Sequence, residues 1–155
     1  MKYLSVWVVV FLLGFSSLSC ASDEFSSSKF AAFKQQHQGK QWLVLLWSLD
    51  CPPCFKELKI IGQLNAQRSD LPVVLINTDD QAGLTEAREK VIEKYGLSQL
   101  TQWHFADDGA AKARFVIDPS WYGELPRSYF YRADGSRVGR SGLVDATLLK
   151  SWLLL

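Results

Sequence analysis

Residues 42–54 read WLVLLWSLDCPPC, a continuous apolar run that leads through a short polar stretch to two cysteines bracketing two prolines. The run over 42–47 has the length of a strand and no alternating polar residues, which predicts a central strand covered on both faces. From Phe55 the apolar residues recur at helical spacing. Prolines are tolerated in a first helical turn, because its amide hydrogens have no partners within the helix. The sequence therefore predicts a buried strand, a short loop and a helix whose first turn carries Cys51 and Cys54.

A Cys-x-x-Cys pair at the start of a helix has a specific chemical use. Unpaired amides and the positive end of the helix favour an anion there, so Cys51 is the expected nucleophile. Cys54 follows on the same face and within disulfide reach, so it can resolve a mixed disulfide by attacking Cys51. Such an exchange transfers two electrons and leaves the pair oxidised. The spacing therefore predicts dithiol–disulfide exchange.

Other uses of a close cysteine pair fit this sequence less well. A structural disulfide would close almost no loop and would therefore remove little entropy from the unfolded chain. A zinc site needs four ligands, but beyond the leader the chain adds only His37 and His104 to the pair, without a paired histidine spacing. Covalent haem attachment needs a histidine where Phe55 stands. We keep the structural disulfide and the zinc site as alternatives, and expect neither a metal nor another cofactor.

Strands and helices alternate along the rest of the chain. A second apolar run predicts a buried strand over 72–77, and the apolar spacing over 85–95 predicts a helix that Gly96 closes. The further expected elements are a short helix before residue 39, a short strand over 100–105, a short helix over 110–115, a strand over 128–131, a turn over 133–136, its partner strand over 137–140, and a last helix over 146–155 capped by Asp145. This order predicts an α/β fold.

The length and charge of the chain limit its partners. Its 155 residues are 48% hydrophobic and 13% aromatic, which excludes disorder and fits one globular domain. The formal net charge is +1, without the clustered surplus of Lys and Arg that binding to nucleic acid or an anionic membrane requires. We therefore expect no nucleic-acid partner, and we expect a monomer.

Residues 1–21 have the features of an export signal. Lys2 precedes an apolar run over 4–15, and small residues lead up to Ala21. The run is shorter than the roughly 20 apolar residues of a spanning helix. We predict a signal peptide over 1–21 that is cleaved after Ala21, and a mature domain over 22–155.

The third cysteine, Cys20, lies inside this leader. A lipoprotein signal is the alternative interpretation, in which Cys20 becomes the lipidated first residue, although Ser17 stands where a leucine is usual. An uncleaved membrane anchor is a third interpretation. Cleavage after Ala21 would leave only Cys51 and Cys54, in an oxidising compartment where a pair forms a disulfide unless something keeps it reduced.

The segment over 42–54 resembles the strand and active site of the thioredoxin superfamily. The leader, together with the long segment between Asp79 and Trp121, resembles the exported TlpA/ResA-like branch. The resemblance implies a thioredoxin-like domain over 22–155 with a central mixed sheet flanked by helices, and an insertion between the second strand and the strand that follows a cis-proline. It also implies that Leu125-Pro126 is a cis bond opposite the cysteines, offering the Leu125 backbone to a substrate as a strand edge. An ordinary trans turn at Pro126 is the alternative.

Two departures from the family pattern bear on the chemistry. Leu45 stands where many thioredoxins keep a buried acid, and Asp50 stands where a tryptophan usually precedes the first cysteine. Asp50 disfavours a thiolate at Cys51, and Pro53 removes an amide donor from the helix start. These features predict that the pair is reducing rather than strongly oxidising.

The expected surroundings of the pair are Trp47, Asp50, Pro52, Pro53 and Glu57. Glu57 could assist proton transfer at Cys54, but we expect a solvated carboxylate on the helix face. Core packing is the favoured role of Trp47. Trp121, beside Tyr122 and before the expected cis-proline, is a candidate for an exposed contact with substrate, together with Leu125 and Pro126.

The resemblance implies an exported, periplasmic thiol-disulfide oxidoreductase that reduces protein disulfides, with Cys51 as nucleophile and Cys54 as resolving thiol. It also implies that a membrane electron-relay protein returns the electrons. A dithiol oxidant or isomerase of the same fold is an alternative. A redox-inactive binding module of the same fold is another.

Overall fold

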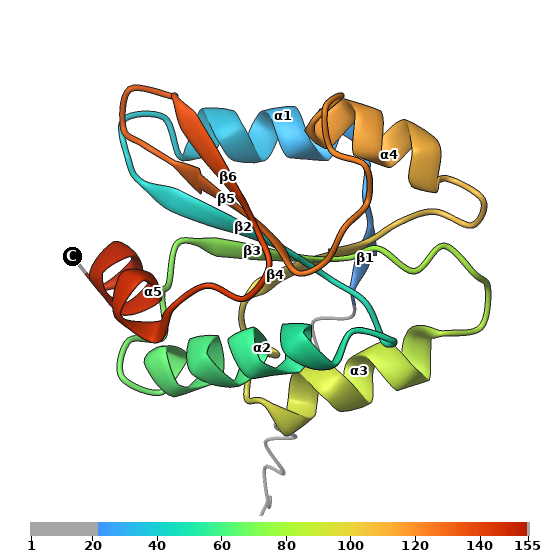
Figure 1. Cartoon of the computed structure of the whole chain (residues 1–155), viewed down its shortest axis with the longest axis horizontal. Helices are drawn as coiled ribbons and strands as arrows, with labels where there is room; N and C mark the ends of the chain where they lie inside the picture. The colour runs from blue at the N-terminus through green and yellow to red at the C-terminus, as the bar shows by residue number, and fades with distance from the viewer. Residues whose placement is uncertain (1–21, 155) are drawn as a thin grey trace, which may run out of the picture.

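A mixed sheet of six strands lies between two layers of helices in the computed structural model, which describes residues 22–154 (Figure 1). The elements are β1 (Asp23–Glu24), α1 (Ser27–Gln36), β2 (Trp42–Trp47), α2 (Pro52–Asn65), β3 (Val73–Asn77), α3 (Thr85–Lys94), β4 (Thr101–His104), α4 (Ala110–Ile117), β5 (Arg127–Tyr131), β6 (Arg137–Ser141) and α5 (Ala146–Leu153). The predicted leader over 1–21 lies outside the described residues. Within residues 22–154, no helix combines the length and apolar character needed to cross a membrane.

The strand order is β1-β4-β3-β2-β5-β6. The first four strands in this order run parallel, and β5 is antiparallel to both β2 and β6. All six residues of β2 are buried, as expected of a strand with neighbours on both sides and helices on both faces. The predicted central strand and the mixed sheet are therefore confirmed.

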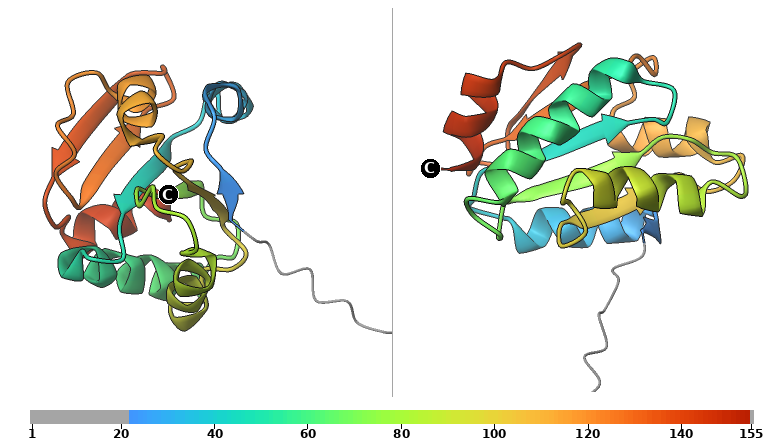
Figure 2. Two further views of the ribbon diagram at one scale, coloured as in Figure 1. Left: turned by 90° about the vertical axis from the view of Figure 1, so that its right-hand side faces the viewer. Right: turned by 90° about the horizontal axis from the view of Figure 1, so that it is seen from below.

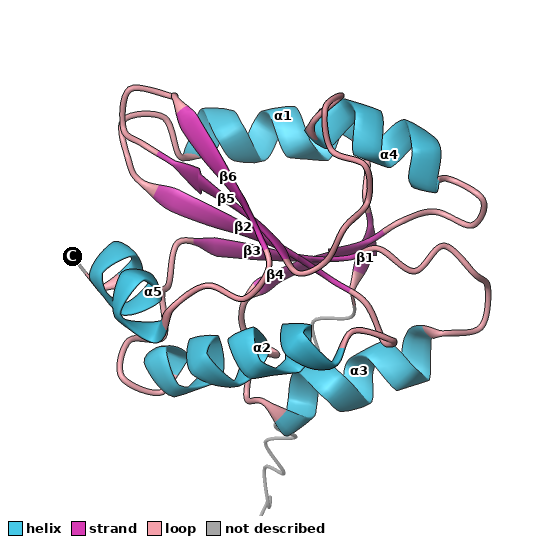
Figure 3. Ribbon diagram, in the orientation of Figure 1, coloured by secondary structure: helices cyan, strands magenta, loops and turns pink. Residues whose placement is uncertain are grey.

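Helices cover both faces of the sheet (Figures 2 and 3), and an apolar core fills the space on each face. Helices α2, α3 and α5 pack on one face, where Leu43, Leu45 and Trp47 of β2 point. Helices α1 and α4 pack on the other face, against the alternate residues Val44 and Leu46. Each fully buried aliphatic side chain contributes roughly 1.5–3 kcal/mol, so this two-sided burial is the main stabilisation of the sheet.

Local signals set several helix ends. Asp145 caps α5 by accepting a hydrogen bond from the Thr147 N–H at 2.8 Å, as predicted. Gly96 follows α3 with a φ of +68°, the left-handed conformation that glycine adopts without steric cost. At the start of α1, Ser26 accepts a hydrogen bond from the Lys29 N–H at 3.2 Å.

The structure differs from the predicted elements mainly at their ends. Strand β1 was not predicted, because its two residues are exposed and carry no apolar pattern. It is held instead by pairing with β4, and the Phe25 N–H extends this pairing to the His104 carbonyl at 2.7 Å. Helix α2 begins at Pro52, α4 continues to Ile117, and α5 ends at Leu153. Between β3 and β5 the chain forms α3, β4 and α4.

Candidate active site

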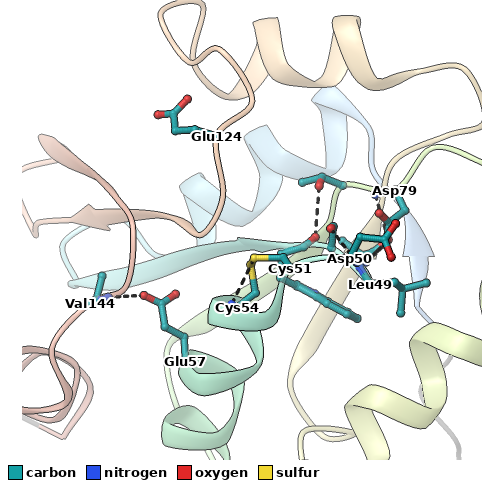
Figure 4. Close-up of a disulfide and its surroundings, with 12 residues drawn as sticks. Leu49, Asp50, Cys51, Cys54, Glu57, Asp79, Glu124 and Val144 are labelled. Carbon is teal, nitrogen blue, oxygen red and sulfur yellow. Dashed lines mark hydrogen bonds between the residues drawn. A yellow bond between two sulfur atoms is a disulfide. The ribbon is translucent and has the colours of Figure 1, made fainter.

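The loop between β2 and α2 holds the first cysteine at the carboxyl end of the central strand (Figure 4). The Cys51 N–H donates to the Ser48 carbonyl at 3.3 Å, which closes a tight turn. The Leu49 N–H donates to Asp79 Oδ2 at 2.8 Å. Asn77, at the end of β3, donates its side-chain amide to the same oxygen at 2.9 Å. A carboxylate just beyond the end of the neighbouring parallel strand therefore fixes the loop that precedes the cysteine pair.

Cys51 and Cys54 form a disulfide with a Cα–Cα distance of 5.3 Å, as predicted for this spacing. Cys51 is the N-cap residue of α2, and prolines occupy the first two helical positions. Because proline has no amide hydrogen, the Cys54 N–H is the first that this helix offers. It donates to the Cys51 carbonyl at 2.9 Å and to Cys51 Sγ at 3.3 Å. The helix start therefore shares its one available backbone donor between the carbonyl and the sulfur of the first cysteine.

The two cysteines differ in exposure. Cys51 is 6% exposed and Cys54 is fully buried. Trp47 lies in the same apolar core as both cysteines, so the expected packing role of Trp47 is confirmed. Pro52 and Asp50 are exposed and Pro53 is half-buried. Cys51 is therefore the cysteine nearer to solvent, although both residues are buried.

The solvated position expected for Glu57 is wrong. Glu57 is fully buried, and its Oε1 accepts a hydrogen bond from the Val144 N–H at 2.5 Å (Figure 4). Within residues 22–154, Oε2 has no hydrogen-bond partner. Burial raises the pKa of this carboxyl from 4.5 to about 7, although the Val144 N–H opposes the shift. A titratable carboxyl therefore lies one helical turn after Cys54, supplied by α2 rather than by the strand position that Leu45 occupies.

Leu125 and Pro126 lie on the loop before β5. Their peptide bond is cis, as the resemblance implied. The Pro126 carbonyl accepts a hydrogen bond from the Gly142 N–H at 2.9 Å. Neither the N–H nor the carbonyl of Leu125 has a hydrogen-bond partner in the part of the chain that the structure describes.

The exposed contact expected at Trp121 is also wrong. Trp121 is 5% exposed, packs in the core beneath α1 and α4, and donates its indole N–H to the Glu124 carbonyl at 3.0 Å. Its neighbour Tyr122 is 95% exposed. The loop therefore buries the first ring as an anchor and presents the second to solvent.

The two histidines lie apart from the cysteines. His37 stacks on Phe33, and His104 Nδ1 lies 2.8 Å from Ser22 Oγ. Among residues 22–154 there is no group of three or more His, Cys, Asp or Glu side chains arranged to hold a metal ion.

Asp79 and Val144 complete the site and were missed from the sequence. Asp79 lies just after β3, the parallel neighbour of β2. The carboxyl ends of parallel strands meet at one edge of a sheet, and this placement was the signal that could have linked Asp79 to the loop. Val144 contributes only a backbone N–H, which leaves no mark in the sequence.

Comparisons with known proteins support the fold. The chain matches no protein-family model and no curated protein. Among solved structures it is similar to a secreted disulfide oxidoreductase of Mycobacterium tuberculosis, described as homologous to DsbE of E. coli, with 24% identity over 76% of this chain and 82% of that one and a TM-score of 0.59. It is similar to a thiol:disulfide interchange protein of the thioredoxin family from Chlorobium tepidum, with 19% identity over 82% of this chain and 81% of that one and a TM-score of 0.58.

The thioredoxin domain of a thiol-disulfide oxidoreductase from Bacteroides vulgatus is a further structural neighbour. It shares 20% identity over 76% of this chain and 83% of that domain, with a TM-score of 0.56. Together these likenesses show that the chain has a thioredoxin-like fold, with its cysteine pair at disulfide distance.

Proposed function

We propose that this chain is an exported thiol-disulfide oxidoreductase that exchanges its Cys51–Cys54 dithiol with the disulfides of protein substrates, in the reducing direction. The observation that carries the proposal is the asymmetry of the pair. Cys51 is the more exposed of the two cysteines, and its sulfur shares the first N–H of α2 with its own carbonyl, whereas Cys54 is fully buried. One cysteine is thus suited to attack a substrate and the other to resolve the product.

In the first step the Cys51 thiolate attacks one sulfur of a substrate disulfide. A mixed disulfide forms at Cys51, and the other substrate sulfur leaves as a thiolate that takes a proton from solvent. The Cys54 N–H and the positive end of α2 stabilise the attacking thiolate.

In the second step Cys54 loses its proton and attacks Cys51 Sγ. The enzyme disulfide forms, the mixed disulfide breaks, and the second substrate sulfur leaves as a thiolate. Glu57 supports this step, because a buried carboxylate with a pKa of about 7 one turn after Cys54 can accept the thiol proton. Two electrons have then passed from the dithiol to the substrate.

The reducing direction is supported by weak stabilisation of the Cys51 thiolate. The first two positions of α2 are prolines, which have no N–H, so of the amides at the first three helical positions only that of Cys54 can stabilise a thiolate. Asp50 beside Cys51 also disfavours a second negative charge. A weakly stabilised dithiol form lowers the reduction potential, so we expect a value nearer to the about −270 mV of thioredoxin than to the about −120 mV of the strongest periplasmic oxidant. A value near the oxidant's would contradict the proposed direction.

The Leu125 backbone supports strand pairing with the substrate. Its N–H and carbonyl have no partners within residues 22–154, and Leu125 packs against both apolar cores, so its position is set by the fold. An extended segment that pairs there gains main-chain hydrogen bonds while its disulfide meets Cys51.

Export and regeneration complete the proposal. The leader over 1–21 places the domain in the periplasm, and one structural neighbour is described as secreted. There a dithiol on a membrane electron-relay protein returns two electrons to the Cys51–Cys54 disulfide. The oxidoreductase itself acts as a monomer. The mass of the mature protein distinguishes cleavage after Ala21 from lipidation at Cys20, and light scattering gives the oligomeric state.

Trapping tests the two cysteine roles. The Cys54→Ala variant cannot resolve a mixed disulfide, so it should accumulate substrate attached to Cys51. Cys51→Ala is the matched control and should trap much less, because Cys54 is fully buried. Equal trapping by the two variants would show that the roles are wrong, and reductase activity in Cys51→Ser would exclude thiol chemistry at this pair.

A further inference from the structure

Polar side chains enclose the loop around Leu125 and Pro126. Arg127 Nη1 donates to Glu124 Oε1 at 3.1 Å and to Ser141 Oγ at 2.6 Å. The Ser141 hydroxyl in turn donates to Glu124 Oε1 at 2.7 Å. The residue before Leu125 is therefore tied to the residue after Pro126, and both are tied to the end of β6. We call this arrangement of Glu124, Arg127 and Ser141 the loop clasp.

The fold holds the Arg127 guanidinium in place. Its Nη2 lies 3.4 Å from Asp118 Oδ2, and the two side chains are only 15% and 11% exposed. The guanidinium lies over the Tyr129 ring, with Cζ 4.7 Å from the ring centroid. A Cβ atom at Gly139 would come within 2.5 Å of Arg127 Nη2, so a side chain at this position would displace the guanidinium.

Asp118 remains charged in this environment. Although desolvation opposes ionisation, hydrogen bonds from Ser120 and Tyr129 lower the pKa of Asp118 to about 2. A charged pair this buried carries a desolvation cost that an apolar pair would not. Stability is therefore a poor explanation for the buried Arg127–Asp118 pair. Orientation is the better one, since the planar guanidinium of Arg127 can hold several acceptors in fixed directions at once.

A second arginine serves as an internal comparison. Arg137 also pairs with Asp118, at 3.5 Å, and its Cζ lies 4.8 Å from the centroid of the Tyr129 ring. It makes no hydrogen bond to Glu124 or Ser141 among the described residues. The two arginines thus share the buried anchor, but only Arg127 reaches the loop.

We propose that Arg127 is a positioning residue, which through Glu124 and Ser141 holds the backbone of Leu125 in the orientation that pairs with an extended substrate. This inference rests on the proposed function. Apolar packing fixes where Leu125 lies, but without the clasp its N–H and carbonyl sample more orientations, and a substrate strand must restrict them as it binds. Chemistry at Cys51 itself does not depend on the clasp.

The test compares Arg127→Met with Arg137→Met on two oxidised substrates, a synthetic disulfide-bonded peptide and the small aromatic disulfide dithiobis(nitrobenzoate). Methionine keeps an apolar stem and removes the donors, and each variant leaves Asp118 three of its partners, namely Ser120, Tyr129 and the other arginine. We expect Arg127→Met to raise the KM for the peptide about tenfold with little change in kcat. The rate with the small disulfide and the reduction potential should stay at the wild-type values.

Glu124→Ala provides a second route to the same result, because the Glu124 side chain is 44% exposed and its removal leaves the buried pair intact. It should raise the peptide KM as Arg127→Met does, while Arg137→Met should leave the KM for both substrates unchanged. The positioning role would be wrong if both arginine variants raised the peptide KM equally, or if Arg127→Met lost as much activity with the small disulfide as with the peptide. Either result would leave the proposed function intact. A wild-type protein that reduces neither substrate would overturn the proposed function and the inference together.

Discussion

The Val144 N–H donates to Glu57 Oε1 at 2.5 Å, joining the loop before α5 to the helix of the cysteine pair (Figure 4). The other carboxyl oxygen, Oε2, is buried and has no partner within residues 22–154. One oxygen is thus fixed by the backbone and the other can carry a proton. The cysteine pair, the carboxyl and this loop therefore form one unit whose charge depends on pH.

The pKa of about 7 at Glu57 predicts a pH-dependent stability. Between pH 4.5, the ordinary value, and about pH 7 the native protein keeps a proton that the unfolded chain has released. Rising pH through this window therefore destabilises the oxidised protein, by up to about 3 kcal/mol, with no further loss from this group above it. Glu57→Gln keeps an acceptor for the Val144 N–H and should lack this dependence.

Urea unfolding of the wild type and the variant, near pH 5 and near pH 8, measures the difference. Glu93→Gln, at an exposed position of α3, is the control and should follow the wild type. If Glu57→Gln lost as much stability with rising pH as the wild type does, another group would be the one that titrates.

The tie between Asp79 and Leu49 predicts that the loop before Cys51 depends on one carboxylate. Asp79→Ala would leave the Leu49 N–H and the buried Asn77 amide without their acceptor. We expect the free energy of unfolding to fall by about 1–3 kcal/mol and the attack by Cys51 to slow. Asp80→Ala is the matched control, because the Asp80 side chain makes no hydrogen bond in the described part of the chain, and it should cost no more than about 0.5 kcal/mol. Equal losses in the two variants would contradict the role of Asp79.

The opposite exposures of Trp121 and Tyr122 predict opposite effects of truncation. Trp121→Ala removes a buried ring and its hydrogen bond to the Glu124 carbonyl, so we expect a loss of about 3–5 kcal/mol in urea unfolding. Tyr122→Ala should change stability by no more than about 0.5 kcal/mol. Because this ring is exposed on the loop before Leu125, its loss should instead raise the KM for a disulfide-bonded peptide about two- to fivefold. A stable Trp121→Ala variant would show that the loop is not anchored by the indole.

Local sequence patterns were sufficient for the central part of this fold. The apolar run predicted the bounds of β2, and the change to helical spacing predicted a helix start at the cysteine pair, where Cys51 is the N-cap residue and Cys54 lies on the first turn of α2. These features depend on residues close together in the chain, whose periodicity reports which faces are buried. The thioredoxin-like fold and the disulfide followed from the same segment.

For Glu57, the local pattern could predict burial but not the hydrogen-bond partner. Cys54, Leu58 and Ile61 mark the buried stripe of α2, and Glu57 lies within this stripe at helical spacing. The helical spacing therefore indicated that Glu57 is buried, but its charge led to the prediction of a solvated side chain. Its hydrogen-bond donor Val144 is 87 residues further along the chain and contributes only a backbone N–H, so that contact could be learned only from the packed structure.

Gly62 on α2 offers a last test of how closely the helices pack. A Cβ atom there would lie 2.0 Å from the Tyr95 carbonyl oxygen, at the end of α3, so the backbone itself would have to move. Helix propensity alone predicts that Gly62→Ala stabilises the protein by up to about 1 kcal/mol. We expect the opposite sign, a loss of about 1–3 kcal/mol in urea unfolding, because the two helices must separate to admit the methyl group. Gln63→Ala, at the exposed next position, is the control and should be close to neutral. A Gly62→Ala variant more stable than the wild type would show that α2 and the end of α3 do not approach this closely.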